Sequence, residues 1–574
     1  MIRKHWLMTK GNKRQQVSHI SQRREFLKRA ATVAAGACIG INPSATTSVV
    51  IAAEPAPAVG ETPELAALRK TAVQRSRRLI YNDDGCGPIM QPGGDTPEGF
   101  LNGANSRMRP LPGTQVDSVF ICSGATHVLN HPTKVAESYA DVTDKYQIGG
   151  EWALMRDNMR ALEKAGTDAV QLTIEFCRQH QFEVVYSHRI NDIHNQFLEV
   201  ERSTWFREHP PYWINTPQNA AQAGGANSPR HWWSALDFER PEVLEHLTAI
   251  QAEVCGRYDI DGVEIDYFRS PMFFRPNLNF QPATPAHRDI LTGFQRRLRE
   301  LHLGAGTKRN RPILTVARVP ATVERCLHVG IDIERWIKER LVDVLTIGGG
   351  YVPFTEPLEE LVAIAHRAGV PAYATISASG MRGPENRYGS HEAWRGAAAN
   401  MWRAGVDGIV TFNIFPTNTE PRFSDLGSPE TLTGKDKLFV IDPIRILEGD
   451  LVQGIEQSQA LPQTIPGDGK PLTCVLPVGD DLPSADQQET LAKVELRVHL
   501  SDPGALDVVE TRLNGMVQEV ASKSAADGWL VFHPRGAQFR RGRNELSFHA
   551  TSAKPDSGKL ADVLHIELSV KYKQ

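Results

Sequence analysis

The sequence of 574 residues lacks several features that would each point to a class of protein. Its seven cysteines are scattered, with no Cys-x-x-Cys pair and no spacing typical of a zinc site, so they predict mostly buried free thiols. The formal net charge of -3 is too small to favour nucleic acid as a partner. No glycine-rich loop follows the first predicted strand, which removes the main indication of a dinucleotide-binding sheet.

A long hydrophobic run is also missing. The apolar stretch at residues 30–41 is too short to span a bilayer as a helix, so a membrane anchor is not favoured. It follows the sequence RREFLK at residues 23–28, and the two together resemble a twin-arginine export signal. We therefore expect residues 1–58 to be a signal peptide and tail. The protein is then expected to be periplasmic or secreted, without a stable membrane span.

From about residue 75 the chain contains a regular alternation of short apolar segments and helical segments. Apolar residues spaced three and four apart predict the helices, and several of these helices end at a glycine. This alternation predicts an α/β fold, a (β/α)8 TIM barrel over residues 75–445, with an aromatic-rich insertion at 190–240. The eight strands are predicted at 77–83, 116–124, 182–189, 261–268, 312–319, 342–349, 371–377 and 408–415.

The pattern changes beyond Pro443. A stretch rich in Pro, Gln, Asp and Ser predicts a linker over residues 446–490. Short alternating segments with turns between them then predict a β-sandwich accessory domain over residues 491–574. A stabilising role and a sugar-binding role both remain open for this domain.

The segment DGVEIDYFRS, residues 261–270, carries two acids where a buried strand should be apolar. Glu264 and Asp266 are two positions apart, so both carboxylates leave the strand on the same face. Two carboxylates this close repel each other, which raises the pKa of one and leaves the other low. An acid and a base need such a difference, so we predict both residues to be catalytic.

Barrels of this kind place their functional residues at the carboxyl ends of the strands. Structural roles remain open for some of the polar residues predicted there: Asp83 and Asp84 form a turn signal with Gly85, Asp192 suits a helix cap, and Arg269 suits a partner that neutralises a carboxylate. The predicted substrate-binding residues are Asp83, Asp84, His188, Arg189, Asp192, Tyr267, Arg269, Arg318, Tyr351 and Asn413, with Trp232 from the insertion.

The run LDFERPEV, followed by a helix and RYDIDGVEIDYFRSP, resembles the glycoside hydrolase-like family 10 barrel. The segment FEVVYSHRIND is similar to the third strand of that family, and the resemblance covers about residues 75–440. It implies a glycosidase-like barrel with Asp266 as the recurrent strand-end aspartate. Glu264 stands where these barrels often have His or another polar residue. The chitinase pattern DxxDxDxE is rejected, because Phe268 replaces its final Glu.

Three functions remain open. The first is a secreted glycoside hydrolase that acts on a poly- or oligosaccharide through Asp266 and Glu264, without a metal or another cofactor. The second is a noncatalytic carbohydrate-binding barrel. The third, ranked last because no compact ligand spacing appears, is a metal-dependent hydrolase. Its ligands would be Asp83, Asp84, His188, His194 and Asp266.

Overall fold

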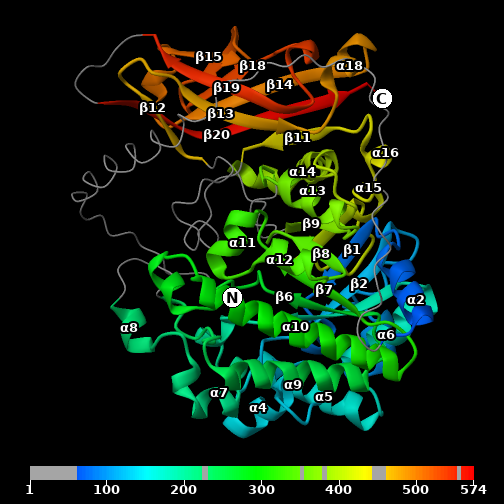
Figure 1. Ribbon diagram of the computed structural model, residues 1–574. Helices are drawn as coiled ribbons and strands as arrows, with labels where there is room; N and C mark the ends of the chain where they lie inside the picture. Colours follow the sequence, from blue (N-terminus) through cyan, green and yellow to red (C-terminus); the bar gives the residue numbers. More distant parts are fainter. Residues whose placement is uncertain are drawn as a thin grey trace, which may run out of the picture. The chain divides into compact units, whose positions relative to one another are not determined.

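The computed structural model describes residues 61–222, 231–349, 354–377, 384–441, 461–551 and 558–573 (Figure 1). The predicted signal peptide and Tyr351 lie outside these residues. None of the helices within these ranges combines the length and the hydropathy needed to cross a bilayer.

Eight parallel strands close into a barrel, in the spatial order β1-β10-β9-β8-β7-β6-β5-β2. The predicted (β/α)8 barrel and all eight of its predicted strands are confirmed. The strands are β1 Leu79–Asp83, β2 Val116–Cys122, β5 Glu183–Arg189, β6 Gly262–Asp266, β7 Leu314–Val319, β8 Val344–Ile347, β9 Ala372–Ser377 and β10 Gly408–Phe412.

Helices lie between the strands, and Figure 1 shows α9 and α10 side by side on the outside of the barrel. Most begin at a Ser, Thr or Asp whose side chain accepts a backbone N–H of the first turn; Asp168 and Ser390 are examples. The helices of this part are α2 Pro63–Val73, α3 Pro97–Asn102, α4 Tyr139–Tyr146, α5 Glu151–Lys164, α6 Ala169–His180, α7 Thr204–Glu208, α8 Pro217–Ala221, α9 Pro241–Arg257, α10 Pro285–Lys308, α11 Val323–Val329, α12 Ile333–Lys338, α13 Glu359–Arg367, α14 His391–Arg403, α15 Arg422–Asp425 and α16 Pro429–Leu432.

Successive side chains of each strand point alternately to the helices and to the barrel interior, so the strands pack on both faces. Val263 and Ile265 of β6 face the helices and belong to the large core. The opposite faces of the strands fill the barrel interior with a smaller apolar cluster. At this level β6 contributes only Gly262, where a Cβ atom would lie 3.1 Å from the carbonyl oxygen of Leu314. The interior cluster consists of Ile80, Phe120, Val185, Leu314, Val316, Val344, Tyr373 and Val410.

A buried ion pair lies at the amino-terminal end of the barrel. Both guanidinium nitrogens of Arg77 that face Glu183 lie 2.7 Å from its carboxylate oxygens. Ser118 donates a further hydrogen bond to Glu183, and Arg77 also donates to the hydroxyl group of Tyr373. This network joins strands β2, β5 and β9 to the segment before β1.

The carboxyl-terminal part forms antiparallel sheets, as predicted for an extra β domain. Residues 446–490 were predicted as a linker, yet their described part contains β12, β13 and α18. Every second residue along most of β13 is buried, as is typical of a strand that has one face against a core. The elements are β12 Gln463–Pro466, β13 Leu472–Val478, α18 Leu482–Gln487, β14 Leu491–Leu500, β15 Val509–Leu513, β16 Met516–Val517, β17 Val520–Ser524, β18 Trp529–Phe532, β19 Gly542–Ala550 and β20 Lys559–Tyr572.

Strand β11, Lys437–Val440, follows the barrel in sequence and pairs with β20. Helix α14 packs against β11. The approach is close at Gly396, because a Cβ atom there would lie 2.2 Å from the carbonyl oxygen of Leu438. The last strand of the chain, β20, thus pairs with β11, which also packs against the barrel helix α14.

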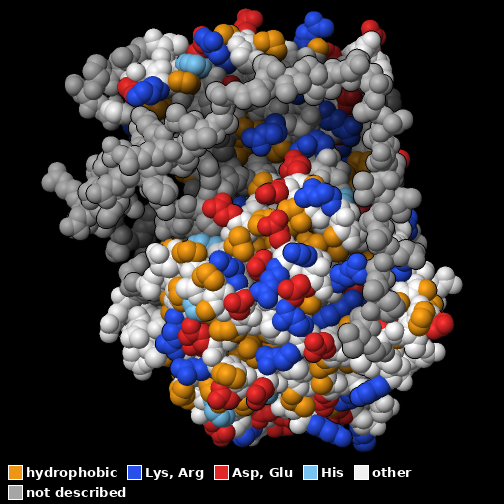
Figure 2. Space-filling model, in the orientation of Figure 1, with side chains coloured by type: hydrophobic (Ala, Val, Ile, Leu, Met, Phe, Trp, Pro, Cys, Tyr) orange, Lys and Arg blue, Asp and Glu red, His pale blue; other side chains and the backbone are white. Residues whose placement is uncertain are grey.

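The surface agrees with the small net charge. Figure 2 shows Lys and Arg side chains interspersed with Asp and Glu on the face that it presents. Typical surface pairs are Arg335 with Asp289 and Arg160 with Asp141. Such exposed pairs contribute little to stability.

Candidate active site

Glu264 and Asp266 lie side by side on β6 and face the barrel interior, above the apolar cluster. In the strand register Glu264 is next to Ser187 of β5 and Val316 of β7. Asp266 is next to Arg189 and Arg318 in the same two strands. The predicted placement of both carboxylates on one strand face is therefore what the structure shows.

Glu264 is held as a buried carboxyl group with a raised pKa. Only 1% of the residue is exposed, and the hydroxyl oxygens of Ser187 and Thr346 lie 2.6 and 2.7 Å from its two oxygens. Burial and the charge of Asp266 raise the pKa of Glu264 to about 7, against the opposing effect of Arg318. Glu264 can therefore hold a proton near neutral pH.

Asp266 accepts hydrogen bonds at both of its carboxyl oxygens. Its Oδ1 accepts the backbone N–H groups of Phe268 and Arg269 at 3.0 and 2.8 Å. Its Oδ2 accepts a hydrogen bond from Nη1 of Arg318 at 3.0 Å. Only 2% of Asp266 is exposed. Both carboxyl oxygens of Asp266 are therefore engaged by the protein, and hydrogen bonds to a carboxylate are strong.

Arg318 fixes this carboxylate and does not face solvent. Its Nε and Nη2 donate to the carbonyl oxygens of Gly348 and Gly349, both at 3.2 Å. The guanidinium carbon lies 4.1 Å from the centre of the Phe412 ring. Arg318 was predicted to bind substrate, but its donors are engaged by Asp266 and the end of β8, Val344–Ile347.

Two predicted substrate-binding residues face the helices and not the barrel interior. His188 contacts the carbonyl oxygen of Thr126 at 2.8 Å, and burial lowers its pKa to about 4. Tyr267 donates to Gln295 of α10 at 2.7 Å. The reason is strand alternation: His188 is one residue from Arg189, and Tyr267 is one residue from Asp266, so each points to the opposite side.

Asp83 and Asp84 form a turn with Gly85, the structural role that was left open for them beside substrate binding. Asp83 accepts the N–H of Gly85 at 2.7 Å and the hydroxyl of Tyr81 at 2.9 Å. Asp84 accepts the N–H of Cys86 and lies 2.5 Å from Nη1 of Arg107. Asp84 keeps part of its side chain exposed, whereas Asp83 is buried.

Of the remaining predicted residues, Trp232 packs in an apolar cluster and Asp192 belongs to a second polar cluster. Trp232 is buried in a small apolar cluster with Ile214 and Met272, so it packs between the insertion and the segment that follows β6. Asn413 follows β10 with a positive φ of 53° and is partly buried. The proposed metal ligands are not brought together, because His188 and Asp266 lie on opposite faces of the barrel sheet.

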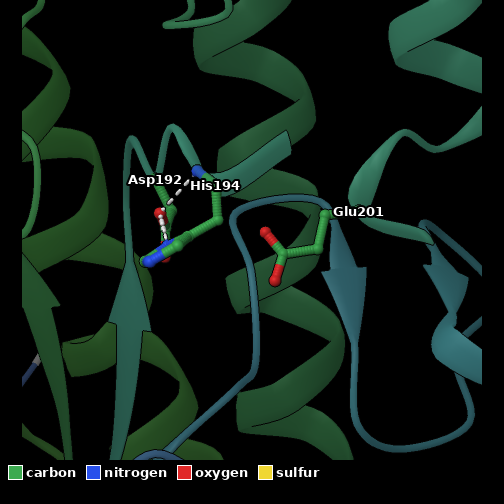
Figure 3. Close-up of side chains that lie close together, drawn as sticks. All are labelled: Asp192, His194 and Glu201. Atoms are coloured by element: carbon green, nitrogen blue, oxygen red, sulfur yellow. Dashed lines mark hydrogen bonds and ion pairs between the residues drawn. The ribbon is translucent and has the colours of Figure 1, made fainter. Parts of the chain in front are cut away.

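The second polar cluster contains Asp192, His194 and Glu201, which follow β5 (Figure 3). Their ligand atoms lie within 4.8 Å of one another, a set that could hold a metal ion. Figure 3 shows the carboxyl group of Glu201 pointing toward the other two side chains. The sequence offered no signal for Glu201, because a single acid in an irregular insertion belongs to no periodic pattern.

Residues 148–279 match the family model Glycosyl hydrolase-like 10. The predicted resemblance is confirmed for this segment, which contains β5, the insertion and β6 with Glu264 and Asp266. The match supports a carbohydrate-acting barrel. No curated protein matches the chain.

Three of the solved structures that match this chain are glycoside hydrolases. The α-L-fucosidase isoenzyme 2 from Paenibacillus thiaminolyticus has 13% identity and a TM-score of 0.38, over 62% of this chain and 48% of that one. The PgaB (BpsB) glycoside hydrolase domain from Bordetella bronchiseptica has 13% identity and a TM-score of 0.37, over 62% and 96%. The Anoxybacillus α-amylase has 13% identity and a TM-score of 0.35, over 85% and 99%. The chain spans about half the length of the fucosidase.

Proposed function

We propose that the protein is a secreted glycoside hydrolase that cleaves a poly- or oligosaccharide, with Glu264 as proton donor and Asp266 as its charged partner. Glycosidases use two carboxyl groups of which one is protonated and the other ionised. The observation that carries the proposal is the unequal environment of these two groups at one strand end. Burial raises the pKa of Glu264, while Arg318 and two backbone N–H groups donate hydrogen bonds to Asp266.

The chemistry follows from this difference. A protonated Glu264 donates its proton to the oxygen of the leaving sugar as the glycosidic bond breaks. The negative charge of Asp266 stabilises the positive charge that develops on the sugar ring as this bond breaks. A water molecule then bonds to the sugar carbon and gives up a proton to the ionised Glu264, which restores the proton donor. Arg318 keeps Asp266 in place during this step.

A second candidate function is carbohydrate binding without cleavage. It is favoured by the low exposure of both carboxyl groups and by the protein partners that each already has. A barrel that has lost turnover would keep such a network as a structural element.

The test is a panel of neutral and acidic glycans incubated with the full chain, with released reducing ends as the measurement. We expect cleavage of at least one glycan, and a loss of about 10²-fold or more in Asp266→Asn. Asp259→Asn is the matched control. Asp259 lies in the connection between α9 and β6, at the opposite end of the strand from Asp266, and its side chain is exposed. Binding without cleavage by the wild type would support the second candidate instead.

Export is tested separately. Residues 23–28 carry the arginine pair of the proposed signal. Replacing Arg23 and Arg24 together by Lys is expected to leave the protein in the cytoplasm, and immunoblots of cell fractions measure this. Unchanged export of the double variant would contradict the proposed route.

A further inference from the structure

One aromatic side chain of the insertion after β5 is open to solvent. Phe197 is 75% exposed, the highest value among the large hydrophobic residues that the structure describes. No other aromatic residue in the described ranges is exposed to a comparable extent. Single exposed hydrophobic residues are common on protein surfaces, so the surroundings of Phe197 decide what its exposure means.

The tryptophans of the insertion are engaged in packing. Trp205 stacks on His246 of α9, with 4.1 Å between the ring centres. Trp213 meets Trp233 edge to face, with 5.2 Å between the ring centres. All three tryptophans are partly buried against the large core. The aromatic-rich insertion thus uses its tryptophans for its own structure and presents Phe197 outward.

The backbone of the turn that carries Phe197 is fixed by hydrogen bonds. The N–H group of Phe197 donates to the carbonyl oxygen of His194 at 2.8 Å. Arg202 donates from Nε to the carbonyl oxygen of Asn195 at 2.6 Å, and from Nη2 to that of Gln196 at 3.1 Å. A ring on a backbone that is already ordered can contact a ligand at a small cost in conformational entropy.

The same turn is joined to the strand end that carries the candidate catalytic pair. Nη2 of Arg269 lies 2.9 Å from Nε2 of His194, and the backbone N–H of Arg269 donates to Asp266 at 2.8 Å. Nδ1 of His194 lies 2.5 Å from Oδ1 of Asp192, and Nη1 of Arg189 donates to Oδ2 of Asp192 at 3.2 Å. The exposed ring therefore belongs to a loop at the carboxyl ends of the strands, continuous with the candidate active site.

The exposed groups next to Phe197 along the chain are polar. The side chain of His194 is 36% exposed and that of Glu199 is 64% exposed. Leu198 and Val200 pack into an apolar cluster instead. The other exposed large hydrophobic residues lie on other segments: Leu68, Val135, Met516 and Val517. Phe197 is thus one ring among polar groups, whereas a contact with a second protein or a membrane requires a contiguous apolar area.

We propose that Phe197 is a surface platform on which one sugar ring of a glycan chain stacks. A pyranose ring has a flat face of C–H groups and an edge of hydroxyl groups, which matches one aromatic ring surrounded by polar side chains. Stacking on an exposed ring requires no cavity, and it places the bound sugar away from the bond that is cleaved. The inference rests on the proposed function for its choice of a glycan, and it makes the substrate a chain of several sugars.

The experiment is calorimetric titration of the full chain with the hexasaccharides of cellulose, chitin, amylose and hyaluronan, and with the corresponding disaccharides. We expect at least one hexasaccharide to bind, and Phe197→Ala to weaken its binding about tenfold, the effect of one lost aromatic contact. Where the hexasaccharide is cleaved, KM should rise by a similar factor while kcat stays unchanged, because the contact is the same in the ground state and the transition state. The disaccharides should not distinguish the variant from the wild type, since they are too short to reach the ring.

Three further variants separate stacking from other effects. Phe197→Tyr keeps the aromatic face and should bind the hexasaccharide as the wild type does. Phe197→Leu keeps an apolar side chain without an aromatic face and should lose most of the tenfold. Leu68→Ala removes another exposed hydrophobic side chain, on α2, and should change neither affinity nor KM. Thermal melting checks the fold, and none of these exposed positions should shift it.

Several outcomes would overturn the inference. Equal affinity of the wild type and Phe197→Ala for each hexasaccharide removes the platform, and so does a wild type that binds none of the four. A dimer of the wild type in sedimentation velocity that dissociates in Phe197→Ala makes the ring a contact between two copies. Hexasaccharide binding that depends on Phe197, without cleavage, leaves the platform standing and contradicts the proposed function; cleavage with an unchanged KM in Phe197→Ala does the reverse.

Discussion

Glu264→Gln is expected to lower kcat for glycan cleavage by about 10²- to 10⁴-fold, the range of a lost general acid. The amide keeps the size of the side chain and can still bond to Ser187 and Thr346, but it cannot donate a proton to the leaving sugar. In the wild type kcat/KM should fall as the pH rises through about 7, because Glu264 then loses its proton. Rates measured from pH 5 to 9 for both proteins check this expectation.

The controls for this prediction concern binding and fold. Glycan affinity of Glu264→Gln should stay close to that of the wild type, since the change removes chemistry and preserves shape. The high-pH decline should be absent from any residual activity of the variant. If the variant cleaves at the wild-type rate, or keeps the same decline near pH 7, Glu264 is not the proton donor.

Arg77→Met is expected to lower the free energy of unfolding by about 3–5 kcal/mol, the usual effect of removing one partner of a buried ion pair. Glu183 would remain buried, with Ser118 but without its cation. Arg77 also donates to the carbonyl oxygens of Ala72 and Val73, which would lose a buried donor. Urea unfolding followed by circular dichroism measures the difference.

The adjacent residue supplies a matched control. Arg78 pairs with Asp117, but 46% of its side chain is exposed, and such pairs contribute about 0.2–1 kcal/mol. Arg78→Met should therefore change stability by less than Arg77→Met. Equal effects of the two changes would mean that burial of the Arg77 pair does not determine its contribution.

The barrel was predictable from the sequence because its signal is local. A strand covered on both sides must be apolar along a continuous run, and 312–319 or 408–415 show this without any tertiary information. The segment around β13 was assigned to a linker for the opposite reason. Proline and polar residues surround it, and its alternate burial depends on pairing with β19.

The site was predictable only in part. Glu264 and Asp266 could be placed on one face because the period of a strand is two, and the same rule places His188 and Tyr267 on the other face. The partners Ser187 and Thr346 depend on the register between neighbouring strands, which no local pattern specifies. Glu201 could not be predicted, since its environment is created by an irregular loop.

The pairing of β11 with β20 sets an order for the folding of the chain during synthesis. The partner of β11 is made more than a hundred residues later, after β12 to β19. Until then β11 is an unpaired edge that can join the equivalent strand of another chain. Helix α14 is made before β11 and can cover one side of it from the start, which shields this edge segment while the remaining strands are still to come.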